Sequence, residues 1–369
     1  MKDPRVERLA RLICRYSIGV KKGDAIVIAY EPVGEPLAEE LYRETLSAGG
    51  HPILRIQPGW AEEIFFREAA PHQLDQTSPS ELHEAEMTRA RILVWAKSNT
   101  RRNSGVDPKK VARAQRARRR IVETYFSRMA KKEWTFMIAP FPVEAEAQEA
   151  DMALSEYEDF VYRALFVDRK DPIAEWKKIS ARQAALVRRF NHIRDLRIVG
   201  EDTDIRMSVK GRKWINCDGH HNLPDGEIFT GPVEDSVEGT IRYTYPAIYQ
   251  GREVTDVRLA FRKGKVVKAE AAKGEDLLKS LLDMDEGARR VGEVAVGTNY
   301  GITRFTRSIL FDEKIGGSIH MAVGRSIPES GGMNQSTLHW DMIKDMRKGG
   351  EIHADGKVVF RNGKFLAEV

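Results

Sequence analysis

Cysteine is scarce in this chain, because only Cys14 and Cys217 occur among its 369 residues. Two thiols cannot supply a disulfide framework or a cysteine-based zinc knuckle, so the sequence predicts a reducing, cytoplasmic compartment. Long apolar runs are missing too, since no stretch reaches the roughly 18 to 20 apolar residues of a membrane span. The charged, helix-periodic start lacks the continuous apolar core of a secretory signal. We therefore expect no membrane partner.

A large excess of one charge is also absent, because 60 basic residues face 55 acidic ones for a net charge of +5. With 41% apolar and 31% charged residues, the composition is that of a globular protein with a heavily charged surface. The most basic segment, residues 101–120, contains no aromatic residue. We interpret it as a solvated helix face or a subunit contact, and a nucleic-acid contact is the weaker alternative.

Several catalytic and cofactor motifs are missing as well. No Gly-x-Gly-x-x-Gly follows a strand-like segment, so a dinucleotide site is not supported. The chain has neither the Gly-x-Ser-x-Gly of serine hydrolases nor the His-Glu-x-x-His of helical zinc sites, and Cys217 lies in no recognised catalytic-cysteine context. Serine, cysteine and nicotinamide chemistry are therefore disfavoured.

Short apolar runs alternate with helical sequence in the first half of the chain. These runs cover residues 24–30, 51–56, 91–96 and 134–139. The alternation predicts a parallel sheet covered by helices. Helical sequence continues through residues 144–191, and strands and hairpins dominate after Leu196, with one helix near residues 275–290.

The length favours two domains, because one hydrophobic core seldom grows beyond about 250 to 300 residues. We expect an α/β protein: an N-terminal α/β domain with connecting helices at residues 1–190, and a C-terminal β-rich α+β catalytic domain at residues 191–369.

Two glutamates stand at positions suited to metal binding. Glu227 follows the turn Pro224-Asp225-Gly226 at the start of an apolar strand, where an exposed hairpin glutamate is the simpler alternative. Glu293 interrupts a buried-looking strand, and alternation places it on the same side as Val291 and Ala295. A carboxylate buried there requires a cation or hydrogen bonds, whereas on an edge strand it would face water.

Two histidines and an aspartate add possible ligands. His320 lies in a short apolar strand after a Gly-Gly turn, where a hydrogen-bonded core histidine is the commoner outcome. His339 and Asp341 share a side of an extended segment, although His-x-Asp arises often by chance.

Taken together, the five residues form a mixed oxygen and nitrogen set that suits Zn, Co or Mn. Five ligands exceed what one open catalytic zinc usually takes. One bridging carboxylate between ions about 3.5 to 4 Å apart would serve both, which favours metal-assisted hydrolysis. Glu293, the acidic residue most enclosed by apolar neighbours, is our candidate for the bridging and catalytic carboxylate.

In these segments the sequence resembles the thermophilic-type metallo-aminopeptidases, a family often called aminopeptidase T or leucyl aminopeptidase-like. The matching stretches are SVKGRKWINCDG, NLPDGEIFTGP, GEVAVGTN, FDEKIGGSIHMAVG and GGMNQSTLHWD, with YEDFVYRAL and DPIAEW upstream. They extend over most of the chain beyond Tyr157, while the N-terminal half matches mainly in architecture.

The resemblance implies an N-terminal α/β domain, a β-rich domain with two divalent metal ions, and a homodimer whose active sites face an internal cavity. It implies peptide substrates that lose their N-terminal residue to a metal-activated water. The metals are expected to be Zn or Co, with Mn as a further option. The family's metal ligands carry over onto Glu227, Glu293, His320, His339 and Asp341.

One position departs from the family pattern. A tyrosine commonly stands seven residues after the histidine that matches His320, and here that residue is Ile327. The main alternative is therefore another metal-dependent amide hydrolase, or a peptidase-like protein with reduced activity. Glu234, Asp235 or a ligand carboxylate could move the proton. His220-His221 could supply additional metal contacts, but we interpret the pair as polar loop residues.

Overall fold

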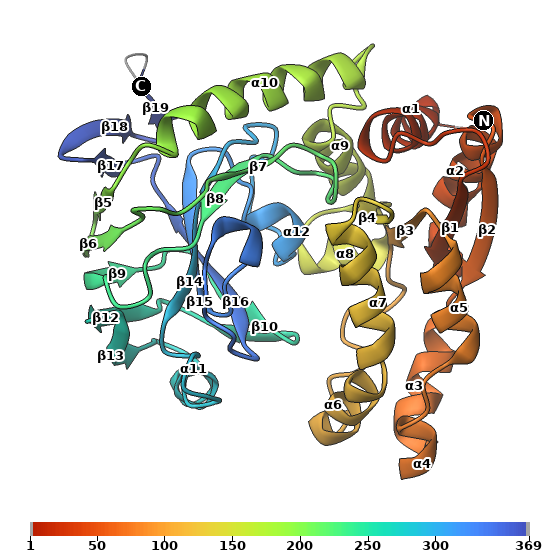
Figure 1. Ribbon diagram of the computed structural model, residues 1–369, viewed down its shortest axis with the longest axis horizontal. Coiled ribbons are helices and arrows are strands. Elements are labelled where there is room, and N and C mark those ends of the chain that lie inside the picture. The colour runs from red at the N-terminus through yellow and green to blue at the C-terminus, as the bar shows by residue number, and fades with distance from the viewer. Residues whose placement is uncertain (1–2, 367–369) are drawn as a thin grey trace. The chain divides into compact units, whose positions relative to one another are not determined.

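The structure, a computed structural model, describes residues 3–366 and divides into two compact units (Figure 1). One unit comprises Met1–Ile173 with Gly219–Leu223, and the other Ala174–Asp218 with Pro224–Val369. Among the described residues, no helix is both long enough and apolar enough to cross a membrane.

A four-stranded parallel sheet forms the centre of the first unit, in the order β2-β1-β3-β4. Its strands are β1 (Ala25–Tyr30), β2 (His51–Ile56), β3 (Ala90–Trp95) and β4 (Thr135–Pro140). The predicted parallel sheet is therefore confirmed. Strand β2 lies at one edge of the sheet and leaves Ile53, Leu54 and Ile56 exposed, whereas β1 is almost fully buried and β3 and β4 mix buried with half-buried residues.

Helices connect these strands, as the alternating pattern predicts. They are α1 (Pro4–Leu12), α2 (Glu35–Ser47), α3 (Gly59–Glu68), α4 (Pro71–Leu74), α5 (Pro79–Met87), α6 (Pro108–Ala117), α7 (Arg119–Ala130), α8 (Glu144–Glu149) and α9 (Leu154–Ala164). A π-helical turn, Ile13–Ser17, follows α1, and a 3-10 turn, Pro32–Gly34, precedes α2. Asp3 and Asp107 cap α1 and α6 by accepting hydrogen bonds from backbone N–H groups.

The basic segment around α6 is largely paired with acidic neighbours. Arg113 lies 2.6 Å from Asp75, and Arg118 forms an ion pair with Glu81. Arginines engaged in this way have less charge to offer to phosphates, which supports the interpretation of a structural, solvated helix face.

Helix α10 (Pro172–Phe190) leads into the second unit, which is built from antiparallel sheets. The larger sheet has the order β13-β12-β9-β6-β5-β17-β18-β19, and the smaller one β16-β15-β14-β8-β7. The strands of the larger sheet are β5 (Asp195–Gly200), β6 (Thr203–Ser208), β9 (Glu238–Arg242), β12 (Arg258–Arg262), β13 (Lys265–Glu270), β17 (Glu351–Ala354), β18 (Lys357–Arg361) and β19 (Lys364–Phe365). Those of the smaller sheet are β7 (Ile215–Cys217), β8 (Glu227–Thr230), β14 (Val291–Gly297), β15 (Ser318–Gly324) and β16 (His339–Asp345).

A hairpin, two helices and a 3-10 turn complete this unit. A separate hairpin joins β10 (Ala247–Tyr249) to β11 (Arg252–Val254), and the helices are α11 (Glu275–Leu282) and α12 (Ile309–Asp312), with a 3-10 turn at Pro328–Ser330. Helix α11 confirms the helix expected near residues 275–290, although it ends earlier. The β-rich character predicted for this part of the chain is confirmed.

Apolar side chains from both sheets form one core. Ile198 and Ile205 of the larger sheet belong to the same cluster as Val294 and Met321 of the smaller one. Because side chains alternate along a strand, each strand of the smaller sheet directs its other residues to the opposite face. That opposite face carries the polar groups described next.

Candidate metal centre

The five candidate ligands come from four strands of the smaller sheet. Glu227 begins β8, Glu293 lies in β14, His320 in β15, and His339 and Asp341 in β16 (Figure 1). Antiparallel pairing aligns these strands, with Ala295 opposite His320 and Ala322 opposite Asp341. The residues next to the candidates in sequence, such as Ile228, Met321 and Trp340, belong to the apolar core, so the candidates lie on the other face.

A β-bulge changes the expected alternation in β14. The pairing with β15 shifts register between Val291 and Glu293. Val291 consequently joins Val294 and Val296 in the apolar core, whereas the sequence pattern placed it on the side of Glu293. The prediction that Val291 and Glu293 lie on the same side of the strand was wrong, because the extra residue of the bulge shifts the alternation of side chains.

The turn before Glu227 requires glycine. Gly226 has a φ of 116°, and a Cβ added there would lie 2.8 Å from the Cβ of Asn299. Beyond the turn, the Gln183 side chain of α10 donates a hydrogen bond to the Glu227 carbonyl at 2.8 Å. These contacts fix the main chain that carries the carboxylate.

The donor atoms of the five side chains converge. His320 Nε2 lies 3.2 Å from Glu293 Oε1, 3.5 Å from Glu227 Oε2 and 3.9 Å from Asp341 Oδ1. His339 Nε2 lies 3.4 Å from Asp341 Oδ2 and 3.9 Å from Glu293 Oε2. The two oxygens of Glu293 thus face different imidazoles, which is the position that a bridging carboxylate requires. The two oxygens of Asp341 are arranged in the same way, but Asp341 lies farther from His320 than Glu293 does.

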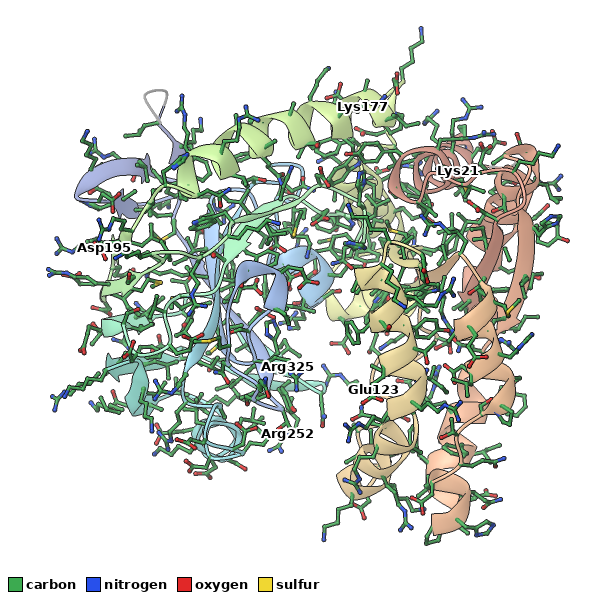
Figure 2. All side chains as sticks on the ribbon, in the orientation of Figure 1. Lys21, Glu123, Lys177, Asp195, Arg252 and Arg325 are labelled. Carbon is green, nitrogen blue, oxygen red and sulfur yellow. The ribbon has the colours of Figure 1, made fainter. Side chains whose placement is uncertain are left out.

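Main-chain carbonyls orient both imidazoles. His320 Nδ1 donates to the carbonyl of Glu313 at 2.9 Å, and His339 Nδ1 donates to the carbonyl of Arg325 at 2.9 Å (Figure 2, where Arg325 is labelled). A carbonyl only accepts, so Nδ1 must carry the proton and Nε2 faces the carboxylates. Metal-binding histidines are commonly held in this way.

Two buried oxygens of the set lack a hydrogen-bond partner. Within residues 3–366, they are Glu227 Oε2 and Asp341 Oδ1. Glu227 and Glu293 are each only 6% exposed and His320 is 0% exposed. A buried acceptor without a partner costs about 1 to 3 kcal/mol, and more when it is charged. Divalent cations would satisfy both oxygens, so the residues present fit a metal centre.

The electrostatics of these side chains point the same way. Burial raises the pKa of Glu227 to about 8, although Lys314 opposes that shift. Burial alone would lower the pKa of His320 and His339, but the surrounding carboxylates raise each to about 10. Burial opposes ionisation of Asp341, yet the two imidazoles hold its pKa well below the usual range. The carboxylates of the cluster therefore favour positive charge beside them. Without a metal, the protonated imidazoles supply that charge.

Sequence reasoning missed several polar neighbours of the five residues. Glu313 groups with His320 and Asp341, and Cys217 and Asp225 group with Glu227, with donor atoms within 4.8 Å of one another in each group. Lys314 is fully buried and lies 3.9 Å from Glu227 Oε1. In the sequence, Asp312-Glu313-Lys314 resembles an exposed charged turn. Its position just before the strand of His320 was the only sign that it lies at the site.

The other candidates have partners of their own. Glu234 pairs with Arg212 at 2.6 Å, and neither Glu234 nor Asp235 belongs to the groups of metal-capable side chains found among residues 3–366. In the first unit, His220 contacts the Tyr16 ring and His221 stacks on Phe136.

Comparison with known proteins places the whole chain in one family. The thermophilic metalloprotease (M29) family matches residues 2–365. Aminopeptidase T of Thermus thermophilus is 31% identical over 92% of this chain and 91% of that protein, and aminopeptidase 2 of Geobacillus stearothermophilus is 27% identical over 100% and 99%. The structure of wild-type AmpT from Thermus thermophilus has a TM-score of 0.81 at 25% identity and covers 98% of this chain and 99% of that chain. The resemblance in the sequence is thereby confirmed, and the chain belongs to the M29 family of thermophilic metalloproteases.

Proposed function

We propose that this chain removes N-terminal residues from peptides by means of water activated between two divalent metal ions. Metal-dependent aminopeptidase activity, a hydrolase reaction, follows from the M29 family and from relatives named aminopeptidases. The observation that carries the two-ion arrangement is Glu293, whose two oxygens face the imidazoles of His320 and His339 separately.

The proposed ligand set assigns each side chain a place. Glu227 and His320 would hold one ion, His339 and Asp341 would hold the other, and Glu293 would be shared by both. Bound there, two such ions would lower the pKa of water and polarise the scissile carbonyl. Zn or Co is the proposed metal, with Mn as a further option, since the donors are mixed oxygen and nitrogen.

Within the chain, Glu293 is the proposed catalytic residue as well as a ligand. Its oxygens face both imidazoles, as those of Asp341 also do, but Glu293 lies closer to His320, at 3.2 Å against 3.9 Å for Asp341. Glu234 is held by Arg212 and by the N–H of Met333 at 2.8 Å, so a carboxylate of the cluster is better placed to accept a proton. The two imidazoles, fixed through Nδ1, hold Glu293 and Asp341 in place, and His320 is fully buried whereas His339 is partly exposed.

A peptidase-like protein of reduced activity, or another amide hydrolase, is the second candidate. Ile327, a half-buried apolar side chain, occupies the position where the family commonly has a tyrosine, and its hydrocarbon cannot donate a hydrogen bond. A homodimer and a cytoplasmic location are proposed from the family resemblance and from the scarcity of cysteine, whose two thiols are both free.

Metal analysis with a panel of aminoacyl amides tests the function. Purified protein should contain up to two divalent ions per chain, lose activity with a chelator, and regain it with Zn²⁺, Co²⁺ or Mn²⁺. The matched N-acetylated peptides should remain uncleaved, because they lack the free amine. Persistent absence of metal after incubation with zinc or cobalt would reject the proposal.

A further inference from the structure

Lys314 is an ammonium group enclosed within the second unit, beside the candidate metal centre. Its side chain is 0% exposed. Its main chain is fixed, because its N–H donates to the Phe311 carbonyl at 3.0 Å and its carbonyl accepts from the Asn299 N–H at 3.1 Å. Water cannot solvate this charge, so its partners must be protein groups.

Those partners are two carboxylates. The Lys314 ammonium forms a close ion pair with Glu313, and its Nζ lies 3.9 Å from Glu227 Oε1. The other oxygen of Glu227, Oε2, has no hydrogen-bond partner among residues 3–366 and lies 3.5 Å from His320 Nε2. The two oxygens of Glu227 therefore face different positive groups: the Lys314 ammonium lies beside Oε1, and the proposed metal position lies beside Oε2.

We propose that Lys314 is a positioning residue that sets how Glu227 binds its metal ion. The ammonium holds Oε1, so that only Oε2 binds the ion. This inference rests on the proposed metal-dependent function. Catalytic metal sites keep one position open for water or substrate, and a carboxylate that binds through both oxygens would close that position.

The charge balance of the site supports the same role. Asp225, Glu227, Glu293, Glu313 and Asp341 all belong to the groups of possible metal donors. Two divalent ions would supply four positive charges against these five carboxylates, and Lys314 supplies the fifth. The lysine ammonium is a compact positive charge at the end of a flexible side chain. While protonated it has no lone pair for a metal, so it can neutralise the carboxylates without coordinating an ion.

Replacement of Lys314 with methionine removes the charge and keeps the length of the stem. The variant K314M should still bind two Co²⁺ ions per chain at least as tightly as the wild type, since the site becomes more negative. Glu227 would then bind through both oxygens, and the absorptivity of the visible Co²⁺ bands should fall about twofold as the coordination number rises. The value of kcat should fall at least about tenfold while KM changes little.

Lys344 provides a matched control. It is a second buried lysine, only 1% exposed, but its Nζ donates to the carbonyls of Glu201 at 2.9 Å and Arg242 at 3.1 Å. The variant K344M therefore removes a buried ammonium group, as K314M does, but it leaves the surroundings of Glu227 unchanged. It should lower thermal stability and leave the Co²⁺ spectrum and kcat of the folded protein unchanged.

The outcomes separate this inference from the proposed function. Failure of the wild-type protein to bind Co²⁺ overturns the proposed function, and the inference with it. Tight binding with identical spectra for the wild type and K314M overturns the inference alone, as does an equal loss of kcat in K314M and K344M. If K314M does not fold, a structure of the zinc-loaded wild type decides: Oε2 alone on the ion supports the role of Lys314, and both Glu227 oxygens on one ion overturn it.

Discussion

The carboxylate of Glu293 and the imidazole of His320 lie 3.2 Å apart on neighbouring strands, with Oε1 facing Nε2. Strand β14 is paired on both sides, to β15 and β8, so Glu293 can move little without disturbing the sheet. The carboxylate is therefore held in place before any ion arrives, as a rigid ligand should be.

Glu293→Gln should weaken the binding of both ions and lower kcat by several orders of magnitude. The amide keeps the shape but removes a negative charge from between two dications. The matched variant Glu227→Gln should weaken chiefly one ion. Metal stoichiometry by elemental analysis, together with kcat, checks both. If E293Q kept two tightly bound metals and near-normal turnover, Glu293 would be a structural strand residue.

Metal binding should release protons near neutral pH. In the metal-free protein the pKa of His320 and of His339 is raised to about 10 by the neighbouring carboxylates, against the opposing effect of burial. Both imidazoles are then protonated at pH 7, and a metal ion requires them neutral. The affinity for divalent metal ions should consequently rise as the pH rises toward 10.

Calorimetry of Zn²⁺ binding in buffers of different ionisation enthalpy measures this release directly. The observed heat should depend on the buffer, with about three protons released per chain at pH 7, two from the imidazoles and one from Glu227, whose pKa burial raises to about 8. Heats that do not depend on the buffer would show that the imidazoles are already neutral in the metal-free protein.

Ile327→Tyr should raise kcat if a phenol at this position supports the reaction. A positioned hydrogen-bond donor typically contributes about a hundredfold or more to kcat, so a gain of at least about tenfold is expected even from imperfect placement. The variant Ile327→Phe adds the ring without the hydroxyl and should give no gain. Equal rates for the two variants would exclude a hydrogen-bonding role for the hydroxyl.

Glu146 should make stability fall with pH in the first unit. Burial raises the pKa of Glu146 to about 8, above its ordinary value of 4.5, and one of its buried oxygens has no hydrogen-bond partner among the described residues. The folded state binds the proton more tightly than the unfolded state, so the stabilisation is complete below pH 4.5 and is lost as the pH rises through about 8.

Glu146→Gln should remove this dependence, because the amide has no proton to lose. Between these pH values the free energy of unfolding should fall more steeply with pH in the wild type than in the variant, by up to about 1.4 kcal/mol per pH unit. Urea denaturation at a series of pH values measures the difference. Glu144, an exposed glutamate of the same helix, offers the control Glu144→Gln, and identical slopes in both variants would disprove the assignment.

Much of the fold follows from short-range pattern. Alternation of apolar runs with helices predicts the parallel sheet of β1 to β4, and the hairpin-rich sequence after Leu196 predicts the antiparallel sheets. The bulge at Val291 could not be predicted, because it depends on how β14 pairs with β15 rather than on the local sequence. The boundary expected between residues 190 and 191 stays a prediction.

The site was predicted less completely than the fold. The five candidate ligands were named from residue chemistry and family resemblance, and the structure brings them together. Their role as ligands remains a proposal. Lys314 was missed because nothing in Asp312-Glu313-Lys314 distinguishes a buried lysine from an exposed one; only the tertiary packing encloses it.

The hydrogen bonds that hold the two imidazoles end on main-chain carbonyls, those of Glu313 and Arg325. Such acceptors cannot be lost by mutation of a side chain, and they do not change with pH. After a chelator removes the metal, the histidines should therefore keep their orientation, and the ligand set should bind metal again without refolding. Exchange of one divalent metal for another should proceed at room temperature under native conditions, at a rate set by dissociation of the ion rather than by rearrangement of the chain.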